Sequence, residues 1–189
     1  MTTRRLTIIA ALALFIGTAG FVAYRYLAPQ APGVEEDSEA GPRRFRLEPT
    51  RVKAHLYFSD VDNSSLAAED RILALPDNVV ERARVMVSAL IDGPKAALTP
   101  TLPAETKLLA LHVTESGTAY VDFSRVISEK HPGGSLSELL TIFSVVNTLS
   151  LNIPEIKAVK ILIEGREAKT LAGHIDIRFP FRPNLLMVK

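Results

Sequence analysis

The sequence contains no cysteine. This absence excludes disulfide bonds, thiolate nucleophiles, cysteine-ligated zinc and lipid attachment to an N-terminal cysteine. An excess of one charge is also missing, because 22 Lys and Arg face 21 Asp and Glu and leave a net charge of +1. A balanced chain lacks the electric field that gathers nucleic acid. We therefore expect no nucleic-acid partner, and a fold that is stabilised by packing alone.

Apolar residues, in contrast, are abundant. They make up 47% of a chain of 189 residues, which is enough for the core of one globular domain. They are unevenly distributed, since the run from Leu6 to Tyr24 carries no charge. A helix of this length spans the hydrocarbon core of a bilayer, about 30 Å. We therefore predict a transmembrane anchor.

The charges around this run predict its orientation. Arg4 and Arg5 precede it and an acidic segment at 35–39 follows it, so the positive-inside rule places the N-terminus in the cytoplasm. Residues 1–27 are then the cytoplasmic N-terminus and a single-pass anchor in the inner (cytoplasmic) membrane, with the rest in the periplasm or at the outer face. A signal peptide cleaved after Ala19 is the alternative.

The chain after the anchor divides into a linker and a domain. Residues 28–50 contain four prolines and the acidic segment, with little to bury, which is typical of a disordered linker. Apolar periodicity begins directly afterwards. We therefore expect the folded domain to occupy residues 51–189.

Periodicity within this domain predicts five strands and two main helices. Apolar residues alternate with polar ones from Val52 to Phe58, as in a half-buried strand. Asn78 stands three residues before Glu81 and opens a run with one apolar face, which Gly93 and Pro94 end, so we expect a helix there. The other expected elements are strands over 70–75, 107–114, 118–123 and 158–164 and a helix from Ser135 to about Leu151.

The predicted order is strand, strand, helix, strand, strand, helix, strand (ββαββαβ). Helices with one apolar face bury it against a sheet, and two packed layers are the simplest solution. We therefore predict a mixed α/β (α+β) domain, a two-layer sandwich with a sheet of about five strands and two main helices.

The segment before the second helix carries a double glycine. Gly133 and Gly134 can form an anion-binding nest ahead of the helix N-terminus, although the stretch has neither the lysine of a phosphate loop nor a dinucleotide fingerprint. A backbone that requires glycine is the alternative interpretation. Ser135 and Glu138 have the spacing of a capping box, so we expect Glu138 to cap the helix instead of acting as an acid.

The second helix also carries a polar side. Small hydroxyl residues at 137, 141, 144 and 148 form a stripe along it. Packing within the domain, with each hydroxyl bonded to its own helix, is one interpretation, and a docking groove is the other. Asn147 lies next to the apolar face, where a buried amide needs hydrogen-bond partners. We expect Asn147 to tie the helix to a neighbouring loop or strand.

Groups suited to catalysis do not converge in the sequence. His174 and Asp176 are two residues apart, as zinc ligands on a strand are, but no third ligand is in view. Asp122 and Ser124 share one side of a strand end without a nucleophile elbow, and we expect Asp122 to organise the following turn. We predict no catalytic residue, no metal site and no cofactor. The candidate binding residues are Asp122, Ser124, Gly133, Gly134, Asn147, His174 and Asp176.

Seven short motifs occur in the order and spacing of a known domain. They are ALIDGP (89–94), LPAETKLL (102–109), AYVDFS (119–124), GGSLSE (133–138), SVVNTL (144–149), VKILIEG (159–165) and LAGHID (171–176). Over about Val52 to Phe181 the chain thereby resembles GerMN domains, the module of the sporulation and spore-germination protein GerM. It carries one copy where GerM carries two, and a predicted anchor where GerM is a lipoprotein. Both departures weaken a role in sporulation and leave an envelope location intact.

The resemblance implies an extracytoplasmic α/β module without established catalysis, similar in architecture to the ring-building modules of envelope-spanning assemblies. We therefore expect a membrane-anchored, non-catalytic module that mediates protein interaction or assembly in the cell envelope. An envelope protein is the expected partner, and a homo-oligomer is an alternative assembly. A peptidoglycan-binding module and a cell-wall hydrolase are the other functions that stay open.

Overall fold

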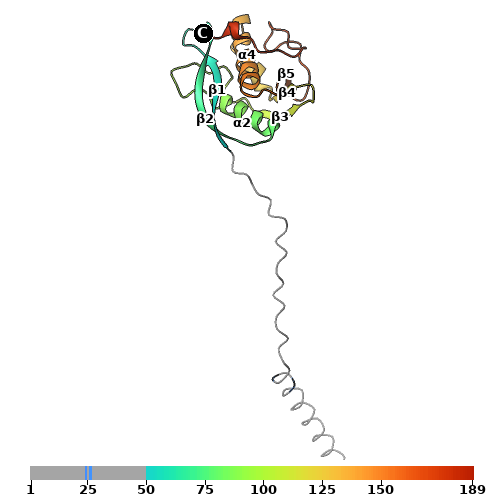
Figure 1. Ribbon diagram of the computed structural model, residues 1–189. Helices are drawn as coiled ribbons and strands as arrows, with labels where there is room; N and C mark the ends of the chain where they lie inside the picture. The colour runs from blue at the N-terminus through green and yellow to red at the C-terminus, as the bar shows by residue number, and fades with distance from the viewer. Residues whose placement is uncertain (1–23, 25, 27–49) are drawn as a thin grey trace, which may run out of the picture. The chain divides into compact units, whose positions relative to one another are not determined.

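The computed structural model describes residues 24, 26 and 50–189 (Figure 1). Its elements are β1 (Thr50–Ser59), β2 (Leu66–Leu75), α2 (Val79–Ile91), β3 (Leu108–Val113), β4 (Thr118–Phe123), α3 (Val126–Glu129), α4 (Ser135–Asn152), β5 (Ala158–Ile163) and the 3-10 helix η1 (Leu185–Met187). The mixed α+β class, the two main helices and the order of the five strands agree with the prediction. The short helix α3 is an addition to it.

The predicted anchor and linker fall almost entirely outside the described residues. Of the segment 1–27 only Tyr24 and Tyr26 are described, and of 28–50 only Thr50. Within the described part of the chain, no helix has the length and apolar character needed to cross a membrane.

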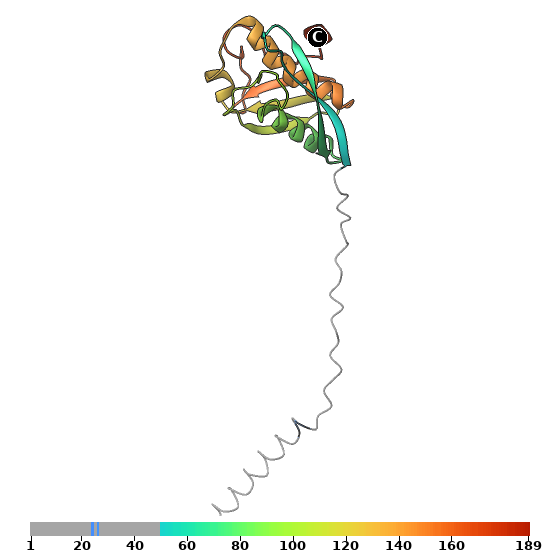
Figure 2. The same ribbon diagram turned by 90° about the vertical axis from the view of Figure 1, so that its left-hand side faces the viewer.

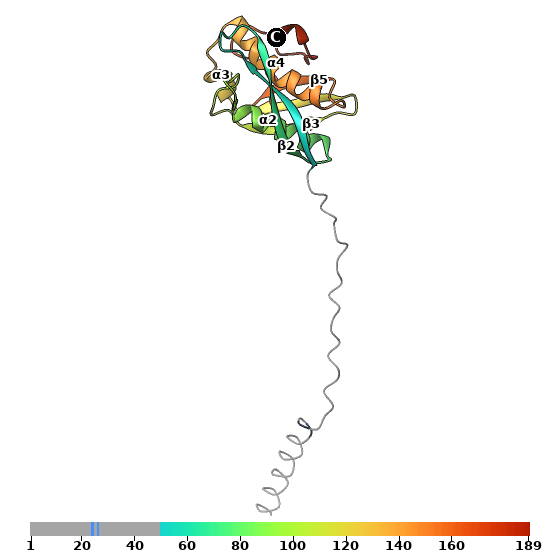
Figure 3. The same ribbon diagram turned by 60° about the vertical axis from the view of Figure 1, so that its left-hand side comes forward.

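The five strands form two sheets, where one sheet was expected. β1 and β2 pair antiparallel along their whole length, whereas β3, β4 and β5 form a second sheet with β3–β4 antiparallel and β4–β5 parallel. Helices α2 and α4 contact strands of both sheets and lie between them (Figures 2 and 3). The core is therefore arranged around the helices and not on one face of a single sheet.

Burial along α4 explains this arrangement. Every residue of the segment 140–149 is buried, so the helix has no solvent-facing side over almost three turns. A helix buried all round needs partners on every side, which one sheet cannot supply. Phe143, for example, packs edge to face against Phe181 of the C-terminal segment, with ring centroids 5.8 Å apart.

The predicted start of α2 is confirmed. Asn78 is the N-cap, and its side-chain oxygen accepts hydrogen bonds from the backbone N–H groups of Val80 (2.9 Å) and Glu81 (3.1 Å). These bonds satisfy two of the N–H groups that have no partner within the helix. At the other end Gly93 adopts a φ of +83°, a conformation that glycine allows without strain.

The edge of β1 that faces away from β2 is satisfied by side chains. Asn152 accepts a hydrogen bond from the N–H of His55 (2.8 Å) and donates one to its carbonyl (2.7 Å). Thr148 accepts from the N–H of Tyr57 (3.1 Å), and Ser144 donates to the carbonyl of Tyr57 (2.7 Å). We call these three α4 residues, which are spaced by four and so share one side of the helix, the polar seam.

The polar seam corrects one prediction. Ser144 and Thr148 belong to the stripe of small hydroxyl residues, whose side chains were expected to bond their own helix. They bond β1 instead, so this half of the stripe packs within the domain. Of the three seam residues, only Asn152 also bonds α4, through the carbonyl of Thr148 (2.7 Å).

The hydrogen bonds of the polar seam also determine which backbone groups of β2 point to its outer edge. His55 directs both backbone groups toward α4, so its antiparallel partner Asp70 belongs to a non-hydrogen-bonded pair and directs its own groups away from β1. At one end of this edge the N–H of Lys189 donates to the carbonyl of Leu66 (2.9 Å). On the exposed face Asp70 pairs with Lys53 (2.6 Å) and His55 (2.6 Å).

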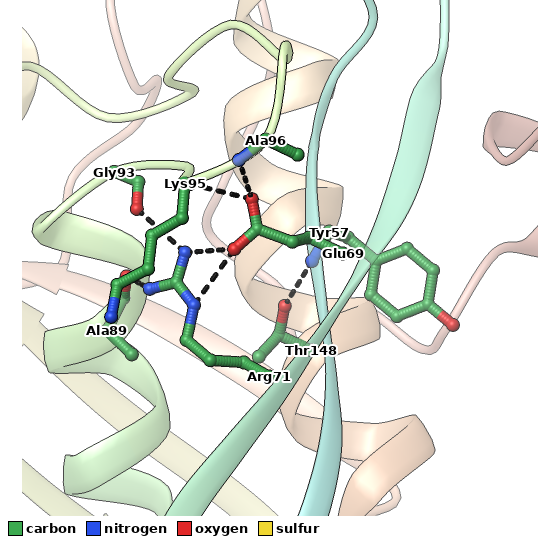
Figure 4. A network of polar contacts seen from close by, with 8 residues as sticks. All are labelled: Tyr57, Glu69, Arg71, Ala89, Gly93, Lys95, Ala96 and Thr148. Atoms are coloured by element: carbon green, nitrogen blue, oxygen red, sulfur yellow. Dashed lines mark hydrogen bonds and ion pairs between the residues drawn. The ribbon is translucent and has the colours of Figure 1, made fainter.

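We predict that Thr148→Val destabilises the domain. The substitution keeps the shape of a fully buried side chain but removes the acceptor of the Tyr57 N–H (Figure 4). An unsatisfied buried N–H costs about 1–3 kcal/mol in the free energy of unfolding, which urea denaturation measures. The matched control is Ser150→Ala on the same helix, because the Ser150 hydroxyl is buried without a partner. Equal stability of the two variants would contradict the role of the polar seam.

Candidate functional site

A groove with a volume of about 400 Å³ lies beside the first half of α4. The end of β1, the loop 99–103, the loop 130–133 and the helix itself form its walls. Ser137, Leu140 and Thr141 are the α4 residues that line it. Lys130 is the one charged residue in this lining, so any electrostatic preference of the groove is for an anion.

A buried ion pair on β2 holds the chain segment that leads to the loop 99–103, the first wall of the groove. The guanidinium of Arg71 bonds the carboxylate of Glu69, with Nε to Oε1 at 2.9 Å, and donates to the carbonyls of Ala89 (3.2 Å) and Gly93 (3.0 Å). The other carboxylate oxygen accepts from the N–H groups of residues 95–96 at 2.7 and 2.8 Å (Figure 4). The end of α2 and the start of the following loop are thereby fixed to β2.

The charge of Glu69 is stabilised by these contacts. Burial alone raises the pKa of this carboxyl, but the backbone N–H of Ala96, the guanidinium of Arg71 and the N–H of Lys95 together outweigh it and lower the pKa. The guanidinium also lies 5.7 Å from the ring centroid of Phe58, a cation–π distance. This ion pair was not identified from the sequence. The signal for it was that Glu69 and Arg71 are two residues apart on a strand and therefore share a face with Leu73 and Leu75.

The loop 99–103 is held against β1 and α4. Thr99 and Ser59 exchange backbone hydrogen bonds of 2.8 and 3.1 Å. The hydroxyl of Thr101 donates to Ser144 (2.6 Å), and the hydroxyl of Thr141 donates to the carbonyl of Thr101 (2.5 Å). The wall is therefore positioned by both the strand and the helix.

Ser59 stands out among the lining residues. Its residue surface is 1% exposed, and its hydroxyl has no hydrogen-bond partner among the described residues. Buried hydroxyls in native structures almost always have a partner.

The second wall precedes α4 and contains the double glycine. Gly133 and Gly134 have φ values of +79° and +91°, which L side chains rarely adopt, and a Cβ at either position would meet no atom within 4 Å. Backbone conformation, and not close packing, therefore requires glycine at these positions. The N–H of Gly133 donates to the ring Nδ1 of His131 (3.0 Å), and the ring Nε2 lies 2.9 Å from the hydroxyl of Thr141. Burial lowers the pKa of His131, and the charge of Glu138 opposes this shift.

The predicted capping box is wrong. Gly134 is the N-cap of α4, and no side chain bonds the free N–H groups of the first turn. Glu138 is fully buried, and its carboxylate accepts from the N–H groups of His174 (3.0 Å) and Ile175 (2.9 Å) and lies 2.6 Å from the His174 ring. Burial raises the pKa of Glu138, but these hydrogen bonds outweigh it and lower the pKa. The carboxylate positions a loop that follows 36 residues later.

Asp122 and Ser124 also serve the backbone. Asp122 on β4 accepts from the N–H of Gly165 (2.8 Å), so it organises the turn after β5 and not the turn that follows it in the sequence. The hydroxyl of Ser124 accepts from the N–H of Lys107 (3.0 Å) and extends the β3–β4 pairing. Neither residue lines the groove.

His174 and Asp176 do not form a metal pair. His174 contacts Glu138, whereas Asp176 forms a two-point ion pair with Arg178, whose side chain lowers the pKa of Asp176 to about 2. Among residues 50–189 no group of three His, Asp or Glu side chains is close enough to hold a metal ion. Sequence reasoning also missed Lys160, which is 1% exposed and donates to the carbonyls of Ile177 (3.2 Å) and Arg178.

Asn147 ties α4 to the C-terminal segment, as the sequence predicted. Its amide donates to the carbonyl of Asn184 (3.0 Å) and accepts from the N–H of the same residue (2.9 Å). The side chain is fully buried and lies outside the groove lining. Of the seven candidate residues, only Gly133 lines the groove.

The lining of the groove offers hydrogen-bonding groups and apolar surface. Its lining consists of hydroxyl, proline, leucine, glycine, one asparagine and one lysine residue, without a carboxylate or imidazole within its described lining. Sequence reasoning missed most of these residues. The available signal was the occurrence of proline in two loops, TPTLP (99–103) and KHPGG (130–134), that flank the helices.

Comparisons with known proteins identify the family and the fold of this chain. The family model Germane, described as sporulation and spore germination, matches residues 55–169. The solved structure "Putative Lipoprotein from Clostridium perfringens" is 27% identical, with a TM-score of 0.52 over 70% of this chain and 87% of that one. The first GerMN domain of GerM from Bacillus subtilis is 23% identical, with a TM-score of 0.52 over 70% of this chain and 97% of that one.

The tandem GerMN domains of the same Bacillus subtilis protein are 24% identical to this chain. Their TM-score is 0.50, over 72% of this chain and 46% of theirs. No curated protein is significantly similar to the sequence. The likeness to the GerM domains shows a shared fold.

Asn147→Ala is expected to lower the stability of the domain. Cutting the amide leaves the N–H and carbonyl of Asn184 without their partners, which costs about 1–3 kcal/mol. Ser137→Ala, at the outer end of the hydroxyl stripe, is the control and should leave stability almost unchanged. Thermal unfolding followed by circular dichroism compares the two variants. An unchanged melting temperature for Asn147→Ala would contradict a structural role.

Glu138→Gln is expected to reduce the acid sensitivity of the fold. Because the pKa of Glu138 is lowered, the ionised carboxylate stabilises the folded state at pH values above 4.5, the ordinary pKa of a glutamate, and this contribution is lost as the pH falls through the folded-state pKa. The melting temperature of the variant should therefore lie below that of the wild type at about pH 7 and approach it at about pH 3. Glu129→Gln removes an exposed carboxylate and is the control. A difference that is constant with pH would contradict this linkage.

Proposed function

Because this chain belongs to the Germane family of sporulation and spore-germination domains, we propose that it is a non-catalytic binding module of the cell envelope. The family match and the GerM structures confirm the resemblance found in the sequence. The proposed task is to hold a protein partner during assembly in the envelope.

The composition of the groove is the observation that carries this proposal. General acid–base catalysis uses a carboxylate, an imidazole, an amine or a similar group within hydrogen-bond reach of the substrate, and the described lining of the groove offers only the amine of Lys130. The carboxylates that seemed available in the sequence are used elsewhere. Asp122 and Glu138 bond loop backbone, and Asp176 pairs with Arg178. Hydroxyls and prolines remain in the groove, and they supply hydrogen bonds and apolar contact.

A protein partner fits the groove better than a glycan. Glycan sites commonly present an aromatic ring that stacks on a sugar face, and the described lining of the groove contains none. Pro100, Pro103 and Leu140 instead offer apolar surface beside the hydroxyls of Thr99 and Ser137. Apolar surface with a few convergent polar groups is the usual character of a binding pocket.

The envelope location forms a second part of the proposal. The uncharged run from Leu6 to Tyr24 and the flanking charges support a single-pass anchor in the inner membrane, with the domain 51–189 outside the cytoplasm. The similar structure from Clostridium perfringens carries the name of a putative lipoprotein, which supports a membrane-associated, extracytoplasmic domain. Protease added to the outer side of intact protoplasts should digest the domain. A protected domain would contradict this location.

In-cell photo-crosslinking tests the binding function. A photoreactive amino acid at position 137, in the groove, should link the full chain to a protein of defined mass. The control is the same amino acid at position 166, an exposed site in the turn after β5. Equal products at the two sites, or none at position 137, would contradict the proposal.

Two further measurements separate the alternatives. Sedimentation of the full chain with purified peptidoglycan would indicate a wall-binding module. Release of soluble glycan or peptide from that material would indicate a hydrolase. We expect neither result.

A further inference from the structure

We propose that the groove binds a carboxylate group of the partner polypeptide. The carboxylate would lie between Lys130, the first turn of α4 and the hydroxyl of Ser59. This inference rests on the proposed binding function and names the chemistry that the groove recognises.

Charge is the first observation. Lys130 is the one charged residue in the described lining, so an anion that enters the groove meets a cation and no opposing carboxylate. The nearest acidic group on α4 is Glu138, whose carboxylate is fully buried and bonds His174 and Ile175. The Glu138 carboxylate therefore lies outside the groove lining and bonds the segment that contains His174 and Ile175.

The N-terminus of α4 is the second observation. This helix has 18 residues, its N-cap is Gly134, and no side chain bonds the N–H groups of its first turn. Gly133 and Ser137, on either side of that turn, both line the groove. Free N–H groups and the positive end of the helix dipole favour an anion at this position.

The hydroxyl of Ser59 is the third observation, and it is independent of the helix. Ser59 is among the residues that line the groove, at the end of β1; it is 1% exposed, and its hydroxyl has no partner in the described part of the chain. A buried polar group without a partner costs stability, so its retention is expected where a ligand satisfies it. A carboxylate oxygen accepts a hydrogen bond from a hydroxyl.

The remaining lining favours a peptide as the carrier of the carboxylate. Pro100, Pro103, Pro132 and Leu140 give the groove apolar walls, which fit the side chains next to an acidic residue. A free inorganic anion would leave these walls without contact. The ligand class is therefore an acidic peptide segment.

Nuclear magnetic resonance titration of the isotope-labelled full chain in detergent micelles tests this inference. The probe is N-acetyl-Glu-Ala-Glu, and the neutral reference is the amidated N-acetyl-Gln-Ala-Gln. We expect saturable shifts of the backbone amides of 133–137 and of Ser59 with the acidic probe. The neutral peptide should bind about tenfold more weakly, since charge-assisted hydrogen bonds are lost.

Three variants make the test specific. Lys130→Gln and Ser59→Ala should each weaken the acidic probe several-fold, whereas Lys157→Gln, an exposed lysine outside the groove, should not. Ser59→Ala should also keep or raise the melting temperature, because it removes a hydroxyl that has no partner. A loss of binding that came only from unfolding would thereby be recognised.

Several outcomes would overturn the inference. Absence of saturable shifts, equal binding of the neutral peptide, or unchanged affinity in Lys130→Gln would each do so. Binding of chitotetraose instead of the acidic probe would assign the groove to a glycan. If position 137 still crosslinks a protein in cells, the carboxylate inference alone fails. If carboxylate binding is seen without a crosslink, the proposed function alone fails.

Discussion

The unpaired edge of β1 is the constraint on which the rest of the structure depends. A two-stranded sheet leaves two edges, and the edge of β1 lies against α4, where the hydrogen bonds of Tyr57 are buried. The side chains of Ser144, Thr148 and Asn152 bond that edge and replace a third strand. This solution places α4 between the two sheets. Two walls of the groove, the end of β1 and the first half of α4, are the parts of these two elements that continue beyond the polar seam.

Buried carboxylates form the second level of organisation. Glu69, Glu138 and Asp122 each accept hydrogen bonds from the backbone N–H groups of a loop distant in the sequence. They bring the irregular segments into fixed positions while the helices and strands supply the apolar core. Residue types associated with catalysis are thus used for architecture in this domain, and the groove is left with neutral groups and Lys130.

Local patterns explain what could be predicted from the sequence. The Asn78 cap and the neighbouring strands predicted over 107–114 and 118–123 depend on residues close in the sequence, and both were found. Glu138 shows the opposite case, because its spacing from Ser135 is that of a capping box while its partners lie 36 and 37 residues later. The division into two sheets could not be predicted from local patterns either. One edge of β1 pairs with β2, but the other edge bonds side chains about 90 residues away in the sequence and not a third strand. The groove is built from four segments that are distant in the sequence, so only the prolines in two of its loops could have indicated it.

The length of the polar seam has a geometric origin. Four residues of α-helix rise about 6.0 Å, and two residues of strand rise about 6.7 Å, so the repeats of α4 and β1 nearly coincide. Asn152 bonds His55 and Thr148 bonds Tyr57, as this match predicts, whereas Ser144 bonds the carbonyl of Tyr57 and does not reach Ser59. At the next position along the strand, Ser59 pairs with Thr99 and not with the helix. The backbone of β1 therefore leaves the helix after Tyr57, and the groove opens where Ser59 and the loop 99–103 take over.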